Sequence, residues 1–246
     1  MARVLCPLPD RDFDPTEAAV PWHTLTRAGH EVVFASEHGE KPACDPLLLT
    51  GVIFGELGAK EKPKALYAAM SSSDALAGPI TWDAIDPSAF DALLLPGGHA
   101  PGMKQYLGSE LLQQKVAAFA ATGKPMGAIC HGVLVLARAR DLASGKSVLH
   151  GRRTTCLPHY MEKIAYTLTA WKRGRYYRTY DAYVEDEVVA ALESPKHFER
   201  GPFTLMTHGT EASDAGAFVV EDGSYVSARW PGDAFLLAKR LLARLA

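Results

Sequence analysis

Two patterns of apolar residues alternate along most of the chain: short continuous apolar runs, and longer segments whose apolar residues recur at helical spacing. Short continuous runs bounded by turn residues are typical of strands buried on both faces, and the longer amphipathic segments are typical of helices that cover a sheet. We predict strands at 2–5, 30–36, 90–95, 126–129, 147–150 and 203–206, and a hairpin at 217–227. We predict helices at 15–28, 65–70, 72–76, 109–122, 131–140, 158–171, 184–192 and 234–245, with a loop at 101–107.

The order of these elements predicts an α/β fold, a three-layer sandwich around a mostly parallel, flavodoxin-like sheet. The first strand, a helix that begins at Pro15 after the N-cap Asp14, and the second strand form a right-handed crossover unit with a parallel strand pair. No internal repeat or low-complexity linker interrupts the chain, so we predict a single domain over 1–246. Residues 37–80 exceed what a minimal crossover needs, and we interpret them as an inserted lid, since long connections in compact domains are usually functional.

The stretch from Lys124 to Ala137 predicts a nucleophile elbow. A short apolar strand runs into Cys130, a helical run starts directly behind it, and the small residues Ala128 and Gly132 flank the cysteine. A strained strand-turn-helix connection needs this spacing, because it pushes the reactive side chain outward and leaves no room for bulk. Unpaired N–H groups at a helix N-terminus lower the pKa of a thiol from its usual value of about 8.5. The alternative is that Cys130 is a small apolar core residue.

Other candidate groups lie where neighbouring strands should end at the same edge of the sheet. Gly97 and Gly98 follow the strand at 90–95, and the amides of Gly98 and His131 would form an oxyanion site. Glu17, in the first turn of the first helix, reaches the same crevice, unless it only complements the helix dipole. His131 would serve as the base for the cysteine, because the backbone turns sharply at an elbow, and it needs a third group to orient its imidazole.

The net charge and the apolar runs of the chain limit the kinds of substrate and partner that we expect. The net charge of −2 offers no basic surface for nucleic acid or an anionic membrane, so we expect a small, neutral or weakly polar substrate. No apolar run approaches the ~18 residues of a membrane-spanning helix, and residues 1–7 are too short for a signal peptide, so we expect a cytoplasmic protein without membrane contacts. Cations and aromatics mix at 173–180, which we interpret as a packed surface segment or a subunit interface.

The cysteines point to free thiols rather than to disulfides or a metal. Cys6, Cys44, Cys130 and Cys156 are scattered without paired spacing, which in a chain of this length argues against a disulfide framework. Cys156 and His159 have the spacing of a zinc half-site, but no second pair of ligands accompanies them. We therefore expect neither a metal nor an organic cofactor.

The Ala-Ile-Cys-His-Gly elbow, the Leu-Leu-Leu-Pro-Gly-Gly-His strand end and Glu17 together resemble the PfpI superfamily, which has a class I glutamine amidotransferase-like fold. The insertion at 37–80 and the long C-terminal segment are similar to its glyoxalase III and heat-shock chaperone branch. The resemblance covers most of the chain. It implies a homodimeric stress-response protein that works without a cofactor.

The resemblance also implies a role for each matching residue. It makes Cys130 the nucleophile and His131 the base, and it places Glu17 against the cysteine sulfur. Gly97 and Gly98 match the strand end that binds the substrate oxyanion.

A later segment, 151–162, resembles the part of the family that carries the acid orienting the histidine, which assigns that role to Glu162. A salt bridge from Glu162 to Lys163 or Arg153 is the alternative. Residues 228–233 depart from the Asn-Pro-x-Ser turn found in many members, so the substrate pocket or the subunit interface should differ.

The resemblance implies a glutathione-independent glyoxalase that converts a 2-oxoaldehyde into a 2-hydroxy acid, with deglycase activity as a related reaction. Two alternatives stay open. One is a cysteine amidase or small-peptide hydrolase, and the other is a redox-sensing or holdase chaperone protein, which exposed apolar surface at 47–57 would favour. If the protein is an enzyme of either kind, its partner is a small-molecule substrate with a reactive aldehyde or an amide group.

Overall fold

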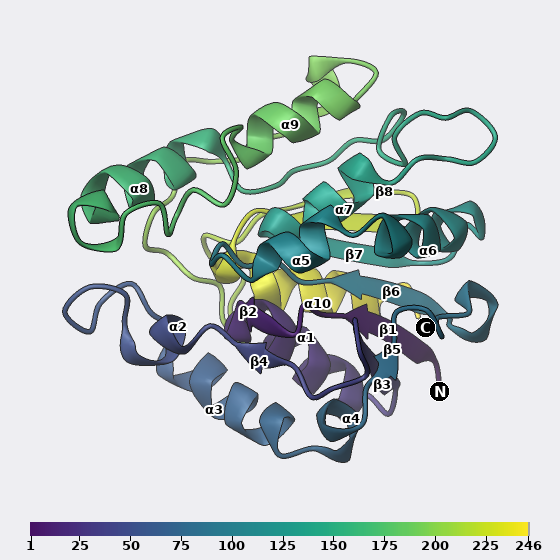
Figure 1. Ribbon diagram of the computed structural model, residues 1–246, viewed down its shortest axis with the longest axis horizontal. Helices are drawn as coiled ribbons and strands as arrows, with labels where there is room; N and C mark the ends of the chain where they lie inside the picture. Colours follow the sequence, from purple (N-terminus) through teal and green to yellow (C-terminus); the bar gives the residue numbers. More distant parts are fainter. Residues whose placement is uncertain (246) are drawn as a thin grey trace.

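The computed structural model describes residues 1–245, and its main element is a seven-stranded sheet in the order β5-β3-β1-β6-β7-β9-β8 (Figure 1). The strands are β1 (Arg3–Pro7), β3 (Glu31–Ser36), β5 (Ile80–Thr81), β6 (Ala92–Leu95), β7 (Met126–Ile129), β8 (Val219–Asp222) and β9 (Tyr225–Ala228). Every neighbouring pair is parallel except β8 and β9. Two further short strands, β2 (Arg11–Phe13) and β4 (Ala43–Cys44), pair beside this sheet. The predicted mostly parallel α/β sheet is confirmed.

Ten α-helices are found within residues 1–245: α1 (Pro15–Arg27), α2 (Pro46–Thr50), α3 (Glu61–Ser71), α4 (Asp74–Ala77), α5 (Met103–Gly108), α6 (Glu110–Ala121), α7 (Val133–Arg138), α8 (His159–Arg173), α9 (Val184–Ala191) and α10 (Ala234–Leu242). The helices α1, α3 and α10 lie together on one side of the sheet, and α5, α6 and α7 lie on the other (Figure 1). The helix α9 packs on α7, and α8 lies next to α9. The strands β6 and β7 are buried throughout, as expected for the middle of a three-layer sandwich.

The first crossover explains how the chain delivers a carboxyl group to the end of β1. Asp14 caps α1, and its carboxylate accepts the backbone N–H groups of Thr16 and Glu17. Pro15 occupies the first helical position, where a missing N–H costs nothing. Such a cap stabilises a helix by about 1 kcal/mol. Glu17 is thereby fixed in the first turn, as predicted.

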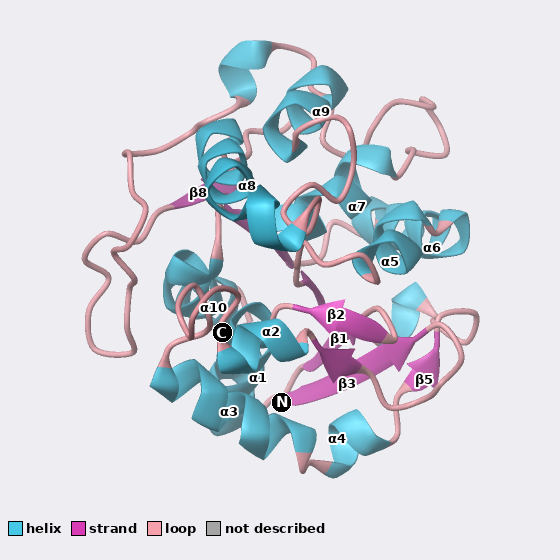
Figure 2. Ribbon diagram, turned by 60° about the vertical axis from the view of Figure 1, so that its left-hand side comes forward, coloured by secondary structure: helices cyan, strands magenta, loops and turns pink. Residues whose placement is uncertain are grey.

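Residues 37–80 contain three helices and contribute to two layers of the fold. The helix α3 packs along α1, and β5 extends the main sheet beyond β3. Figure 2 shows α3 beside α1 and α10, on the opposite side of the molecule from α8 and α9. A separate apolar cluster of Leu48, Val52, Ala100 and Tyr176 joins α2 and the loop after it to the segment that follows α8. This cluster and β4, which pairs with β2 just before Asp14, bring part of 37–80 close to the active-site candidates.

Several elements differ from the sequence predictions. Residues 147–150 and 203–206 form no strand, and residues 101–107, predicted as a loop, contain most of α5. The predicted hairpin is present, but it lacks the type I′ turn that the Asp222-Gly223 pair in its sequence predicts. Its loop is Gly223-Ser224, and of these two residues only Gly223 has positive φ, at 58°. Short apolar runs do not indicate whether a partner strand is available, so four-residue predictions of this kind fail most readily.

Candidate active site

Cys130 lies at the predicted sharp turn between β7 and α7. Its φ is 58°, in the left-handed region, and a single 3₁₀ turn over Cys130–Gly132 leads into the helix. A non-glycine residue with such a φ costs about 1–3 kcal/mol and persists only where the surrounding packing enforces it. Gly132 supplies that packing, because a Cβ at this position would overlap the backbone carbonyl oxygen of Leu95 at the end of β6. The strain and the small flanking residue together mark a nucleophile elbow.

Glu17 and Gly97 meet beside this elbow. The Gly97 N–H donates a 2.8 Å hydrogen bond to Glu17 Oε2. A Cβ on Gly97 would lie 2.8 Å from that oxygen and 2.8 Å from the backbone nitrogen of His131, so only glycine fits between them. Glu17 is fully buried, its Oε1 has no hydrogen-bond partner within residues 1–245, and it lies close enough to the Cys130 thiol for each group to shift the pKa of the other. The structure therefore brings Glu17, Gly97 and Cys130 together, as predicted.

Burial of Glu17 and Cys130 determines which of the two side chains is ionised. Burial raises the pKa of Glu17 well above its ordinary value, and the nearby Asp14 raises it further. Burial also raises the pKa of the Cys130 thiol, and a negative charge on Glu17 adds to this effect. The backbone N–H of His131 lowers the thiol pKa, but by less than burial raises it, so the sequence expectation of a lowered thiol pKa does not hold in this structure. Ionising both Glu17 and Cys130 is unfavourable because their negative charges repel each other, so a neutral Glu17 favours the Cys130 thiolate.

His131 is held between the cysteine and a threonine. Its Nδ1 lies 3.5 Å from Cys130 Sγ, and its Nε2 lies 3.4 Å from Thr179 Oγ1. Because the Thr179 hydroxyl donates its proton to the backbone carbonyl of His99 at 2.7 Å, it offers only a lone pair to His131. That arrangement favours the tautomer with the proton on Nε2, which leaves Nδ1 free to accept the thiol proton. Burial lowers the pKa of His131 to about 3, so the ring is neutral at rest.

Thr179 was missed by the sequence analysis. It lies in the segment 173–180, which we interpreted as a packed surface or a subunit interface, and a single threonine in a loop carries no motif. Only the three-dimensional position of its hydroxyl reveals it.

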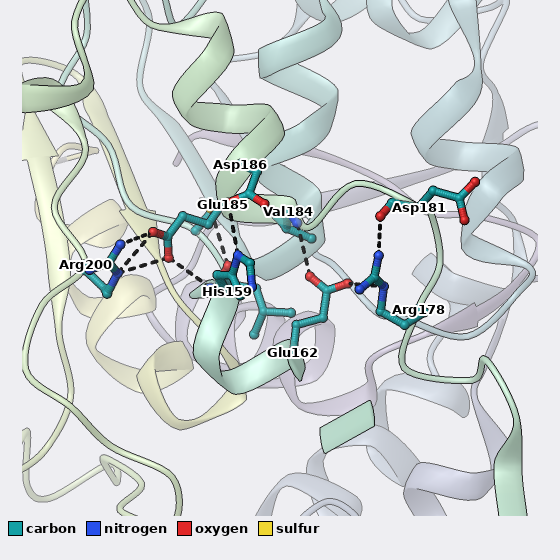
Figure 3. Close-up of polar contacts among 10 residues, drawn as sticks. His159, Glu162, Arg178, Asp181, Val184, Glu185, Asp186 and Arg200 are labelled. Carbon is teal, nitrogen blue, oxygen red and sulfur yellow. Dashed lines mark hydrogen bonds and ion pairs between the residues drawn. The ribbon is translucent and has the colours of Figure 1, made fainter. Parts of the chain in front are cut away.

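Glu162 is not brought to His131. Its Oε2 accepts the Val184 N–H at 3.1 Å and its Oε1 lies 3.7 Å from Arg178 Nε (Figure 3). Within residues 1–245 no hydrogen bond joins Glu162 to His131. Burial raises the pKa of Glu162 to about 7, partly offset by Val184 and Arg178. Its ion-pair partner is neither Lys163 nor Arg153 but Arg178, the residue before Thr179, so any effect of Glu162 on His131 passes through that segment.

The two glycines after β6 play different parts. The Gly97 N–H is already bound to Glu17, whereas the Gly98 N–H has no hydrogen-bond partner within residues 1–245. Gly98 has a φ of 150°, and a Cβ there would lie 2.8 Å from the backbone oxygen of Asp12. Of the predicted pair, Gly98 is therefore the one whose amide is available to a substrate oxygen.

A cavity of about 520 Å³ is lined by Thr179, the residue that contacts His131, but not by Cys130, His131, Glu17 or Gly98 themselves. His99 and Thr179, which are hydrogen-bonded to each other, contribute to its wall. The other lining residues are Leu47, Pro101, Lys104, Lys172, Arg173, Arg175, Tyr176 and Arg178. A cavity of this size is typical of small-molecule sites. A second cavity, of about 470 Å³ beside α9, contains none of the predicted site residues.

One cluster in the described part of the chain has the spacing of metal ligands: Asp10, Glu37 and His38. The Gln105 side-chain amide donates to the carboxylates of both Asp10 and Glu37, and the cluster shares no residue with the elbow.

Among the helices of residues 1–245, none combines the length and the apolar composition needed to cross a bilayer.

Fold and site together define an α/β protein with a buried cysteine in a strained strand-turn-helix elbow at the carboxyl edge of a parallel sheet. The family model described as ThiJ/PfpI family-like matches residues 8–202. The chain belongs to this family, as the sequence resemblance implied.

Individual relatives agree with this assignment. Deglycase PH1704 of Pyrococcus horikoshii is 31% identical over 151 residues, which cover 60% of this chain and 68% of that protein. Protein/nucleic acid deglycase 2 of Escherichia coli is 29% identical over 158 residues, covering 64% and 72%. The structure of glyoxalase III from Candida albicans shares the fold, with a TM-score of 0.70 at 19% identity over 99% of this chain and 97% of the other.

Proposed function

We propose that this protein is a cofactor-independent cysteine enzyme that converts 2-oxoaldehydes into 2-hydroxy acids without glutathione, and that it also removes such aldehydes from their adducts. The observation that carries the proposal is the chain of contacts from Cys130 Sγ through His131 to Thr179. The names of the deglycase and glyoxalase III relatives support the same class of substrate.

The first step is attack by sulfur. His131 Nδ1 accepts the thiol proton, the thiolate of Cys130 adds to the aldehyde carbon, and the aldehyde oxygen takes up a proton to give a hemithioacetal. A protonated Glu17 donates a hydrogen bond to the sulfur and removes the repulsion that an ionised carboxylate would exert. In this proposal the free Gly98 N–H stabilises the developing oxyanion.

The second step moves a proton between carbons. His131 removes the proton from the carbon bonded to sulfur to give an enediol, and the neighbouring carbon is then protonated to give a 2-hydroxy thioester. Water cleaves the thioester, releasing the 2-hydroxy acid and returning the Cys130 thiol. The net change is addition of one water molecule to the oxoaldehyde, so no external oxidant or reductant is needed.

Formation of lactate from methylglyoxal in the absence of glutathione tests the proposal. We expect wild type to form lactate and Cys130→Ser, which keeps the shape of the site, to lose this activity. A panel of amide and dipeptide substrates run in parallel tests the hydrolase alternative. Cys130-dependent amide cleavage without lactate would overturn the glyoxalase assignment.

A holdase role is a second candidate, because apolar side chains gather on one surface outside the active site. Phe54 and Leu57, in the predicted segment 47–57, are 79% and 42% exposed, and Trp171 on α8 is 70% exposed. The rings of Phe54 and Trp171 lie 6.3 Å apart, so they form one patch. Suppression of client aggregation that persists in Cys130→Ser and is lost in Phe54→Ser would support this role. We propose that the same patch would otherwise be covered in the homodimer that the family resemblance implies.

A further inference from the structure

The cavity lined by Thr179 is strongly cationic although the whole protein carries a net charge of −2. Its wall contains five cationic side chains and no acidic one: Lys104, Lys172, Arg173, Arg175 and Arg178. Charges of one sign around a concave site focus the potential and raise the local concentration of ions of the opposite sign.

Three of these cations form no ion pair in the described chain, although Arg173 lies close enough to Asp45 to lower the pKa of that carboxyl. Arg175 pairs with Asp181 and Arg178 pairs with Glu162. The other three cations, Lys104, Lys172 and Arg173, form no ion pair within residues 1–245. The Lys104 and Lys172 ammonium groups face the rings of Tyr180 and Phe54, at 5.7 and 4.0 Å from the ring centres, and Arg173 donates to the backbone carbonyl of Val52. The cavity therefore carries a positive charge, on Lys104 and Lys172, that no ion pair within the described chain neutralises.

The cavity is linked to the candidate reaction centre through two of its lining residues, Thr179 and His99. Thr179 lines it and also contacts His131 Nε2. His99 lines it as well, and its buried Nε2 has no hydrogen-bond partner within residues 1–245. A ligand in the cavity therefore extends from the wall of the reaction centre toward the uncompensated cations.

We propose that this cavity is a subsite for an anionic group of the substrate, so that the preferred substrate is a 2-oxoaldehyde carrying a carboxylate or phosphate remote from the aldehyde. This inference rests on the proposed function. It replaces the expectation of a neutral or weakly polar substrate, which followed from the net charge of the whole chain and not from the charge of the site.

Substrate preference tests the subsite. We would compare kcat/KM for three 2-oxoaldehydes of equal length that end in a carboxylate, a phosphate or an alcohol, and the first two distinguish the sources of negative charge. We expect wild type to prefer an anionic aldehyde by about tenfold and to lose the preference as salt concentration rises. The double variant Lys104→Gln/Lys172→Gln should lower the ratio of anionic to neutral kcat/KM by about tenfold.

Lys163→Gln provides the matched control, because Lys163 is an exposed lysine of α8 that does not line the cavity. It should leave the ratio unchanged. Equal kcat/KM values for anionic and neutral aldehydes in wild type, or a preference that survives in the double variant, would overturn the inference.

A binding measurement separates the failure of this inference from the failure of the proposed function. Phosphate and succinate are titrated into wild type, the double variant and Lys163→Gln by calorimetry. Saturable binding that weakens only in the double variant supports the anionic subsite even if no aldehyde is turned over. Binding that is absent in wild type, or equal in all three proteins, overturns it even if lactate is formed.

Discussion

At the residue scale, Thr179 decides which nitrogen of His131 carries the proton. Its hydroxyl proton is committed to the His99 carbonyl, so it accepts from Nε2 and leaves Nδ1 facing Cys130. A carboxylate would fix the same tautomer and also stabilise the imidazolium. A hydroxyl does only the first, which matches a histidine that burial keeps neutral.

We predict that Thr179→Val lowers kcat roughly a hundredfold, the lower end of what a correctly placed general base contributes. Thr179→Ser keeps the hydroxyl and should retain most of the activity. Nitrogen NMR shifts of His131 provide the readout that a purely structural role would not change: the Nε2–H tautomer should dominate in wild type and Thr179→Ser and become mixed in Thr179→Val. Unchanged tautomer populations in Thr179→Val would refute the positioning role.

A second residue-scale prediction concerns Glu17 and the thiol. Ionisation of Glu17 as the pH rises further raises the pKa of Cys130, whereas glutamine stays neutral throughout the titration and its amide can still accept from Gly97 and donate toward the sulfur. We therefore expect Glu17→Gln to shift the pH midpoint of Cys130 alkylation by iodoacetamide downward, on the order of one unit. The exposed Glu31→Gln is the control and should leave the midpoint in place. An upward shift would mean that the carboxyl proton stabilises the thiolate better than an amide does.

At the scale of elements, the packing of the elbow against β6 depends on one missing side chain. Gly132 has an ordinary helical φ of −58°, so alanine there is opposed only by overlap with the backbone carbonyl groups of Leu95 and Pro96, and backbone cannot move aside cheaply. We predict that Gly132→Ala lowers the free energy of unfolding by about 3 kcal/mol, as overpacking of a rigid site does. Urea denaturation measures this loss. Gly151→Ala, at a glycine with open space around it, should be close to neutral, and an equal effect of both variants would refute the steric explanation.

The helix α1 begins with a cap that titrates near neutrality. Burial raises the pKa of Asp14 from 3.8 to about 7, with Asp45 adding to the rise. Between pH 3.8 and 7, the Asp14 carboxyl is protonated in the native state and ionised in the unfolded state. Protonation therefore stabilises the native state fully below about pH 4, and this stabilisation is lost as the pH rises through 7. Relative to Asp14→Asn, which also caps helices well, wild type should become less stable over this range. A stability difference that is flat from pH 4 to 8 would contradict the raised pKa.

The same scale shows what the sequence can and cannot predict. The elbow, the cap at Asp14 and the glycine pair after β6 follow from local spacing, because each is a short motif at the end of a strand or the start of a helix. The short strands predicted at 147–150 and 203–206 do not form, because their existence depends on a partner strand elsewhere in the chain. Glu162 was assigned from resemblance, and the structure places it with Arg178 instead.

At the scale of the whole molecule, the site forms where three adjacent strands end. The order β1-β6-β7 places the starts of α1, the glycine loop and the elbow side by side, which explains why residues so distant in sequence meet. The opposite wall comes from the segment after α8, whose mixed cations and aromatics have no periodicity. Sequence reasoning therefore finds the reaction centre on the sheet side and misses Thr179 and the cationic cavity.

The central claim is that Cys130 forms a covalent bond to the oxoaldehyde with His131 as its base. Rapid acid quenching of wild type mixed with methylglyoxal, followed by peptide mass spectrometry, tests it most directly. We predict a transient adduct of one substrate molecule on the peptide containing Cys130, formed before lactate appears and absent in Cys130→Ser. Lactate produced at an undiminished rate by Cys130→Ser, or an adduct only on other residues, would contradict the account.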